Sequence, residues 1–232
     1  MAGSVIAGNT FDYASVHGKA MLEAGYPFHS CSNERFVSDQ YIHVKDWTVD
    51  LICGKQIKTP AGNNIRYEVF PREMQRAINE FVSIGGNILV SGAYIGTDLQ
   101  DSIYPIQKDS TSCAIAEEFA ADVLGYKFIT NQASRKGKVI PVVNKLRLDP
   151  DAVQIVTEPN SDIYCIESPD GIAPASTSGH IIYRYADSGI SAGVATECNG
   201  YRCIALGFPI EALSGPEMID NIIETSLEYF RK

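Results

Sequence analysis

The chain has 232 residues, of which 45% are hydrophobic and 20% are charged, a composition typical of globular proteins. Its formal net charge of −9 disfavours nucleic-acid binding, which needs a basic surface. No apolar run approaches the roughly 20 residues that cross a bilayer, and the N-terminal MAGSVIAGN lacks the features of a signal peptide, so neither a membrane span nor a leader is expected.

Helices and strands are expected to alternate in the first part of the chain. Apolar residues recur at helical spacing in two segments, each followed by glycine, and short apolar runs lie between these segments. This βαβ spacing predicts an α/β fold with a three-layer, doubly wound, mostly parallel sheet. The expected strands are residues 4–8, 26–31, 48–53 and 87–91, the expected helices are residues 12–24 and 71–83, and residues 57–67 are expected to form a loop.

The second half is richer in short strands. Helices are expected over residues 113–124 and 216–230, and Asn199-Gly200 predicts a tight hairpin between two apolar runs. No linker-like segment interrupts the chain, so residues 126–208 are expected to form an antiparallel β elaboration within a single domain of residues 1–232. The strands expected in it are residues 139–143, 152–156, 163–166 and 181–185, followed by the hairpin strands 189–198 and 201–208.

Polar residues follow several of the expected strands. Ligands of doubly wound sheets bind beyond the carboxyl ends of the parallel strands. The candidate ligand-binding residues at these ends are Asn9, Thr10, Gln56, Tyr94 and Asp98. No G-x-G-x-x-G fingerprint follows the first strand, so we expect no dinucleotide, and no other cofactor is indicated.

Residues 87–96, NILVSGAYIG, contain a glycine-bracketed turn directly after an apolar strand. The spacing is that of a nucleophile elbow, G-x-Nuc-x-G, in which a sharp turn raises one side chain into a cleft. Tyr94 occupies the raised position, where a hydrolase would carry Ser or Cys. In that position an aromatic ring either offers a stacking face to a sugar or peptide or plugs the pocket.

The segments GAYIG and LGFPIE, the second just before the last helix, resemble the class I glutamine amidotransferase-like, flavodoxin-like fold. The phrases GNTFDYASVHGKAML, GKQ, SGAYIGTDL and ALGFPIEAL are similar to a module of Bacteroidetes exported proteins described as xanthan lyase-like. This resemblance spans nearly the whole chain. It implies a module of a larger secreted, periplasmic or cell-surface protein, with neighbouring domains that act on carbohydrate or cell-wall material.

The catalytic residues of the amidotransferase pattern are mostly missing here. The cysteine position holds Tyr94, and the late segment keeps an acidic residue, Glu211, but no histidine beside it. A tyrosine hydroxyl, with a reference pKa of about 10, is a poor nucleophile without strong activation. No confident catalytic set can therefore be assigned, and the chain is expected to be catalytically silent.

The histidines and one cysteine are the other residues that could replace the missing catalytic groups. His180 follows a loop that could reach the cleft, whereas His17, His29 and His43 are expected to be packing or surface residues, and Cys113 to be a small buried hydrophobe near a helix start. No metal is expected, because the spacing of the acidic residues after the elbow fits no EF-hand loop and they are better interpreted as solvated loop acids. They are Asp98, Asp101 and Asp109.

The six cysteines form no C-x-x-C pair, which argues against a zinc ribbon or a thioredoxin-type motif. Cys198 and Cys203 flank the hairpin turn, where Cys198 would face Tyr201 and Cys203 would face Thr196. The two sulfurs would be diagonal neighbours, a poor geometry for a disulfide.

Three functional hypotheses stay open at this point. The first is a catalytically silent scaffold or ligand-binding module with a saccharide or peptide ligand. The second is a hydrolase or lyase with a rearranged site at the strand ends, built from Tyr94, His180, Glu211 or Asp98. The third is an interaction or oligomerisation domain.

Overall fold

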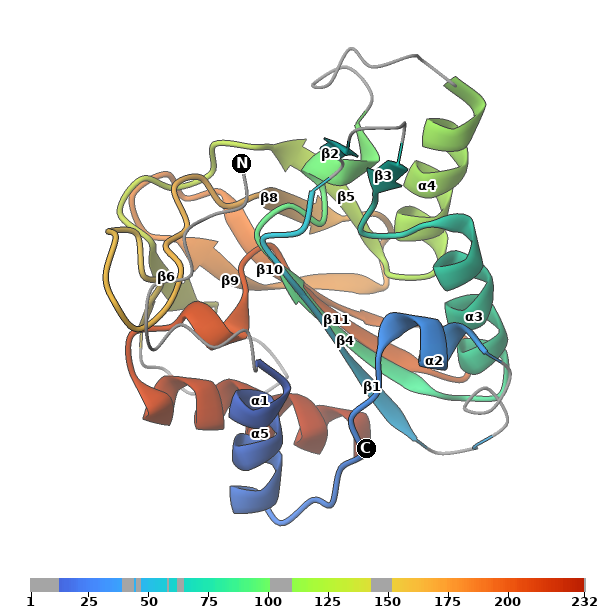
Figure 1. Cartoon of the computed structure of the whole chain (residues 1–232), viewed down its shortest axis with the longest axis horizontal. Helices are drawn as coiled ribbons and strands as arrows, with labels where there is room; N and C mark the ends of the chain where they lie inside the picture. Colours follow the sequence, from blue (N-terminus) through green and yellow to red (C-terminus); the bar gives the residue numbers. More distant parts are fainter. Residues whose placement is uncertain are drawn as a thin grey trace.

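Figure 1 shows the computed structural model, which describes residues 13–38, 44, 47–57, 59–61, 65–100, 110–142 and 152–231. The fold is mixed α/β. Its helices are α1 (Tyr13–Glu23), α2 (Asn33–Val37), α3 (Arg72–Ser83), α4 (Ser110–Asp122) and α5 (Pro216–Arg231), with short 3₁₀ helices η2 (Thr97–Leu99) and η4 (Ile210–Ala212). None of these helices has the length and apolarity needed to cross a bilayer.

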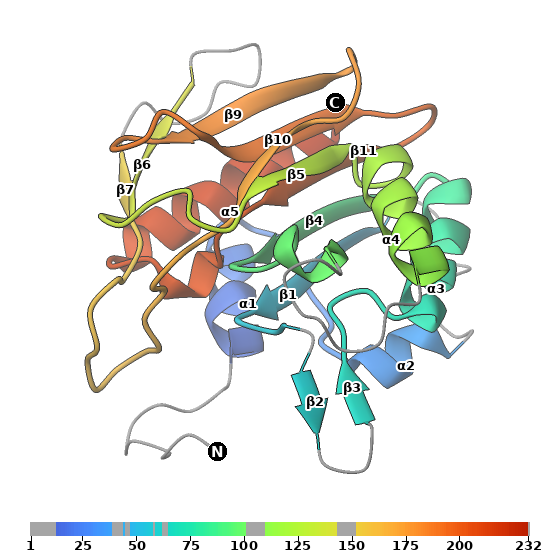
Figure 2. The same cartoon turned by 90° about the horizontal axis from the view of Figure 1, so that it is seen from above.

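Within the described residues, seven strands form one sheet in the order β1-β4-β11-β10-β9-β6-β7. The strands of this sheet are β1 (Thr48–Gly54), β4 (Asn87–Gly92), β6 (Lys138–Pro141), β7 (Val153–Gln154), β9 (Gly179–Tyr185), β10 (Ser191–Glu197) and β11 (Arg202–Leu206). Two further pairs are separate: β2 (Thr59–Ala61) with β3 (Ile65–Tyr67), and β5 (Tyr126–Thr130) with β8 (Gly171–Pro174). Figure 2 shows how the main sheet curls between its helices.

The expectation of a mostly parallel sheet is wrong. β4 lies between β1 and β11 and is parallel to both, but the other four pairings, from β11 to β7, are antiparallel. The second half of the chain therefore does supply antiparallel strands, as expected. Four of these strands belong to the main sheet and extend it beyond β11, so they are not an addition to a separate parallel sheet.

The two faces of the sheet carry separate hydrophobic clusters. Successive residues of a strand point to opposite faces, so Ile88 and Val90 pack with α3 and α4, whereas Leu89 packs with α1 and α5. Because β4 is covered on both sides, its side chains are buried from Ile88 onward, which explains its continuous apolar sequence. The expectation of helices on both faces is confirmed.

Several local predictions are confirmed and some are wrong. The helices near residues 12–24, 71–83, 113–124 and 216–230 are present, and the Asn199-Gly200 hairpin joins β10 to β11. Residues 26–31 and 163–166 are not strands, and the predicted loop at residues 57–67 contains the β2–β3 pair. Within residues 26–31, Phe28 packs on α1 instead of in a sheet, since a Cβ added at Gly18 of this helix would lie 2.1 Å from the Phe28 ring. The expected strand at residues 4–8 lies outside the described residues.

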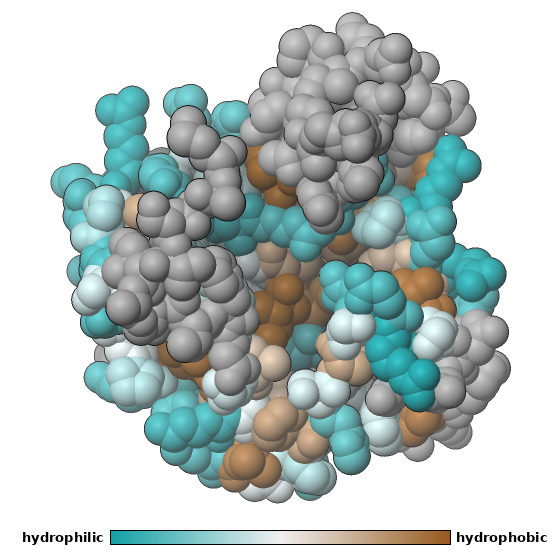
Figure 3. All heavy atoms as spheres, in the orientation of Figure 1, coloured by the Kyte–Doolittle hydropathy of each residue, from teal (hydrophilic) through white to brown (hydrophobic). Residues whose placement is uncertain are grey.

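The carboxyl ends of β1, β4 and β11 meet at one edge of the sheet because these strands are parallel. This edge is followed by the turn after Gly54, the turn after Gly92, and the segment that leads from Leu206 to η4. Figure 3 shows, for the face seen in Figure 1, apolar residues near the middle and hydrophilic residues mostly towards the margin.

Candidate functional site

The centre of the site is a histidine held between two carboxylates. His17 of α1 is 1% exposed. Its Nδ1 lies 2.6 Å from Asp50 Oδ2 on β1, and its Nε2 lies 3.3 Å from Glu211 Oε2 on η4. Tyr164 then donates a hydrogen bond of 2.6 Å to Glu211 Oε1, and its ring packs edge-to-face on Tyr13. We call these five residues the His17 cluster.

Local sequence explains how α1 brings its histidine so close to the sheet. His17, Gly18 and Ala20 are the buried residues of the helix, so its inner face is made mostly of small side chains. Asp50 lies on the same face of the sheet as Leu89, its register partner, and this face is the one that α1 covers. Because the inner side chains of α1 are small, the helix can approach the sheet closely. Successive strand residues point to opposite faces, and Asp50 points towards α1, so the imidazole lies directly over the carboxylate.

The charges of the cluster favour a protonated histidine. Burial by itself lowers the pKa of His17, but the carboxylates of Asp50 and Glu211 outweigh burial and raise this pKa to about 10. Burial and the nearby Glu211 charge raise the pKa of Tyr13 to about 12 and that of Tyr164 still further. The cluster therefore holds one cation, two carboxylates and two neutral phenols at neutral pH.

This arrangement is poorly suited to acid–base catalysis. A general base works best with a pKa near the working pH, and His17 is charged well above that range. Its two nitrogens are both engaged by carboxylates, and Glu211 is 2% exposed. Among the described residues, Asp50 Oδ1 is buried without a hydrogen-bond partner. This unsatisfied oxygen lowers the stability of the fold, and the ion pair with His17 must offset that loss. The cluster instead ties α1, β1 and η4 together.

The turn after β4 does not present a catalytic elbow. Tyr94 is partly buried and packs against the cluster of apolar residues beneath α1 and α5. The turn continues into the 3₁₀ helix η2, and Asp98 N donates to Tyr94 O at 3.0 Å. Tyr94 is packed on one side and partly exposed on the other, so stacking and plugging both stay predictions.

Backbone amides of the same turn are already occupied. Asp170, a buried carboxylate just before β8, accepts hydrogen bonds from Gly96 N at 2.7 Å and Thr97 N at 2.6 Å. Its other oxygen accepts from Thr97 Oγ1 at 2.5 Å. In a nucleophile elbow the oxyanion is bound by the amide of the residue after the nucleophile, which corresponds to Ile95 here. The contacts of Asp170 hold the two residues that follow this amide, and they fix the path of the turn.

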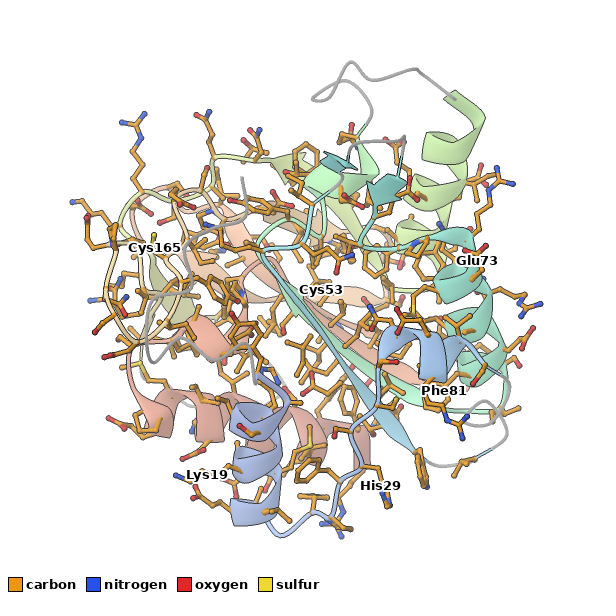
Figure 4. All side chains as sticks on the ribbon, viewed as in Figure 1. Lys19, His29, Cys53, Glu73, Phe81 and Cys165 are labelled. Atoms are coloured by element: carbon orange, nitrogen blue, oxygen red, sulfur yellow. The ribbon has the colours of Figure 1, made fainter. Side chains whose placement is uncertain are left out.

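Cys53, at the end of β1, is no substitute nucleophile. Its side chain is buried in the centre of the molecule (Figure 4). Burial, with smaller contributions from the charges of Glu211 and Asp98, raises the pKa of the thiol far above its ordinary value. Five cysteines of the described residues are free thiols: Cys31, Cys53, Cys165, Cys198 and Cys203. As predicted, Cys198 faces Tyr201 and Cys203 faces Thr196 across the hairpin.

A pocket of about 230 Å³ lies beside the strand ends, between the start of α3, η2 and α4. Asp98, one of the predicted ligand-binding residues, is part of its wall, and Asp98 Oδ2 accepts a hydrogen bond of 2.8 Å from Val69 N. Gln56 supports the same wall indirectly, because its side chain donates to Glu68 O at 2.6 Å. The lining residues are Glu68, Phe70, Pro71, Arg72, Glu73, Gln75, Asp98, Leu99 and Ala116.

The other predicted residues lie elsewhere. His180 is exposed on β9, where its register partner is Ala195, and no described hydrogen bond or ion pair joins it to Glu211. His29 stacks on Trp47, with ring centroids 5.8 Å apart. Asn9, Thr10, His43, Asp101 and Asp109 lie outside the described residues, as does the side chain of Cys113. No metal-binding group of three or more His, Cys, Asp or Glu occurs in the described part of the chain.

The most connected residues of the site are ones that the sequence pattern does not single out. His17 was expected to be a packing or surface residue, and Glu211 to lack a histidine partner. The structure buries His17, which agrees with a packing role, but it corrects the second point, since the imidazole that pairs with Glu211 comes from the first helix, 194 residues away. Asp50 and Asp170 are not among the predicted site residues. One signal was available: a polar Asp50 within the apolar run TVDLIC marks a strand residue that needs a buried partner.

Comparisons with known proteins do not assign the chain to a family. No protein-family model and no curated protein matches the sequence. Among solved structures, the chain is similar to the exo-beta-1,4-mannosidase Op5Man5 from Opitutaceae bacterium strain TAV5, at 10% identity and a TM-score of 0.38. The match covers 69% of this chain and 22% of the mannosidase, so the chain spans only a small part of that enzyme.

These findings correct the amidotransferase-like and xanthan lyase-like expectation. No protein-family model matches the chain, that of the amidotransferase-like fold included. The strand order beyond β11 is antiparallel, in contrast to the mostly parallel sheet that the resemblance implied. The short motifs on which that resemblance depended describe a strand-turn and a proline turn, which unrelated α/β proteins also use.

Proposed function

We propose that this chain is a catalytically silent ligand-binding domain whose ligand occupies the pocket beside α3. The observation that carries the proposal is the internal pairing of the groups that could do chemistry. His17 is engaged by Asp50 and Glu211, and the amides of the elbow turn are engaged by Asp170. A substrate would have to displace these internal partners before any of them could act.

The pocket has the chemistry of a small polyhydroxylated ligand. Carboxylates of Glu68, Glu73 and Asp98 accept hydrogen bonds from hydroxyl groups, and the apolar lining of Leu99 and Ala116 suits the C–H face of a sugar ring. Its volume of about 230 Å³ lies below the ~300–1,000 Å³ of pockets that enclose drug-sized ligands. We therefore propose a monosaccharide or the end of a glycan chain as the ligand.

The wider context is part of the same proposal. The ligand chemistry is consistent with a carbohydrate-directed role, and neighbouring domains of a longer exported polypeptide would supply any catalysis. The organisation of residues 1–232 as one domain is likewise proposed. Limited proteolysis of this chain would test it, since a single protected fragment is expected and two separately stable fragments would contradict it.

The direct test is a binding screen with a matched pair of variants on one helix. Glu73 lines the pocket, whereas Glu80 lies on α3 outside the lining. We would follow ¹H–¹⁵N shifts during titration with glucose, mannose, galactose and N-acetylglucosamine. Glu73→Gln is expected to weaken binding by about tenfold or more, since a hydrogen bond to a charged group contributes about 1.5–3 kcal/mol. Glu80→Gln should leave binding unchanged. Binding that is absent in the wild type, or equal in both variants, would contradict the proposal.

One observation favours a hydrolase with a rearranged site as the second candidate. Tyr164, Glu211 and His17 form a continuous hydrogen-bonded chain at the carboxyl ends of the parallel strands. This candidate predicts hydrolysis of chromogenic glycoside or ester substrates that disappears in Glu211→Gln while the fold is retained. The proposed silent domain predicts no turnover above the buffer blank in either protein.

A further inference from the structure

The outer edge of β1 is an open edge of the main sheet. Asn87 N of β4 donates to Trp47 O at 3.1 Å, so every second residue of β1 after Trp47 turns its backbone N–H and C=O groups toward β4. The residues in between turn these groups away from β4, and they are Thr48, Asp50 and Ile52. Within the described part of the chain, no strand lies beside these groups and no hydrogen bond joins them to another residue.

The sequence of β1 is not that of an edge strand. Exposed edges of natural sheets usually carry lysine, proline or a free charge that prevents further pairing. TVDLIC has one charged residue, Asp50, and its carboxylate is already paired with His17 beneath α1. The apolar residues Val49 and Ile52 are only half-buried, whereas β4, with a strand on each side, is buried along nearly its whole length. The composition of β1 therefore suits a strand with neighbours on both sides.

Two helices lie on either side of this edge (Figures 1 and 2). Through Ala20, α1 belongs to the hydrophobic cluster on one face of the sheet, and through Phe36, α2 belongs to the cluster on the other face. The connection between them passes the amino-terminal end of β1, where His29 stacks on Trp47. A strand added to β1 would lie between the two helices, a position that favours an apolar segment without charge.

Such a segment directly precedes α1 in the sequence. Residues 4–8, SVIAG, form the first strand that the sequence predicts, and they lie outside the described residues. The helix begins at Tyr13, whose ring packs on Tyr164, and a Cβ at Gly54 would lie 3.4 Å from Tyr164 Oη, so α1 starts at the carboxyl edge of the sheet. Residues 9–12 can span roughly 13 Å. A strand that ends at this edge before α1 begins runs parallel to β1.

We propose that residues 4–8 add to the open edge of β1 as a further parallel strand of the main sheet. The added strand pairs with the outward-facing backbone groups of β1 and covers its half-buried apolar side chains. It also brings Asn9 and Thr10, two of the predicted ligand-binding residues, to the carboxyl edge of the sheet beside the His17 cluster.

The segment fits this edge better than a second copy of the chain does. Two copies would bring together molecules with a net charge of −9 each, whereas residues 1–8 carry no charged side chain. A strand of a second folded copy would also have to enter between α1 and α2, whereas residues 4–8 are already joined to α1 by four residues.

Hydrogen exchange of the Thr48, Asp50 and Ile52 amides tests the added strand. These amides should be protected in the wild type. Ile6→Pro should lower their protection relative to the β10 amides by about tenfold or more, because proline lacks the N–H and disrupts a strand. Ala2→Pro, outside the segment, is the matched control and should leave the protection unchanged. Unprotected amides in the wild type, or equal protection in the wild type and Ile6→Pro, would overturn the proposal.

A second measurement needs no variant and covers the case in which Ile6→Pro does not fold. In the wild type, NOEs between residues 4–8 and β1 in the pattern of parallel strands would support the proposal. Their absence would refute it, as would NOEs from β1 to a second molecule in a mixture of labelled and unlabelled protein. Strand addition requires no ligand, so it can fail while saccharide binding succeeds, and the converse also holds.

Discussion

Replacing His17 by leucine tests whether the His17 cluster stabilises the fold. The substitution keeps side-chain bulk but removes the cation between Asp50 and Glu211, whose side chains are 7% and 0% exposed. Removing one partner of a buried ion pair costs about 3–5 kcal/mol, because the remaining charges are left uncompensated. This is a large part of the ~5–15 kcal/mol that typically stabilises a domain, so the urea midpoint should fall sharply.

Two controls make the result specific to the ion pair. Lys19→Ala, on the same helix, breaks only an exposed pair with Glu23 and should cost less than about 1 kcal/mol. Glu211→Gln should destabilise the wild type, but in the His17→Leu background it removes an unpaired buried charge and should be neutral or stabilising. A loss below about 1 kcal/mol in His17→Leu, or the same cost of Glu211→Gln in both backgrounds, would refute the reasoning.

Three further outcomes are expected. The pKa of His17 is raised to about 10, so the stability that His17 contributes is fully present below about pH 6.5 and is lost as the pH rises toward 10. Urea titrations at alkaline pH should therefore show that the free energy of unfolding falls more steeply with pH in the wild type than in His17→Leu. The pKa of Asp170 is also raised, so its contribution is lost between about pH 4 and 7, by at most ~1.4 kcal/mol per pH unit, and Asp170→Asn should flatten this slope. Gly125 has a φ of 75°, and a Cβ there would lie 2.2 Å from Thr196 Oγ1. Gly125→Ala should therefore lower the thermal midpoint more than Ala121→Gly in the neighbouring helix. An equal effect of the two substitutions would contradict this interpretation.

Local sequence was sufficient for most of the elements that build the sheet and its helical layers. The alternation and apolar runs of β1, β4 and the β10–β11 hairpin are properties of neighbouring residues, as is the apolar stripe of α5. The same holds for the turn after β4, since two glycines and a preceding strand are readable without a structure. Such features depend on interactions within a few residues, so periodicity and turn chemistry can predict them.

The site itself was decided by tertiary structure. His17 meets Glu211 across 194 residues because β4 lies between β1 and β11 and brings their ends to one edge. Asp170, just before β8, meets Gly96 across 74 residues. Strand order depends on the packing of the whole chain, which no local period encodes. A histidine on a helix and a glutamate after a proline are ordinary surface candidates in sequence. They became a buried ion pair only when α1 and η4 were packed on the same face of the sheet.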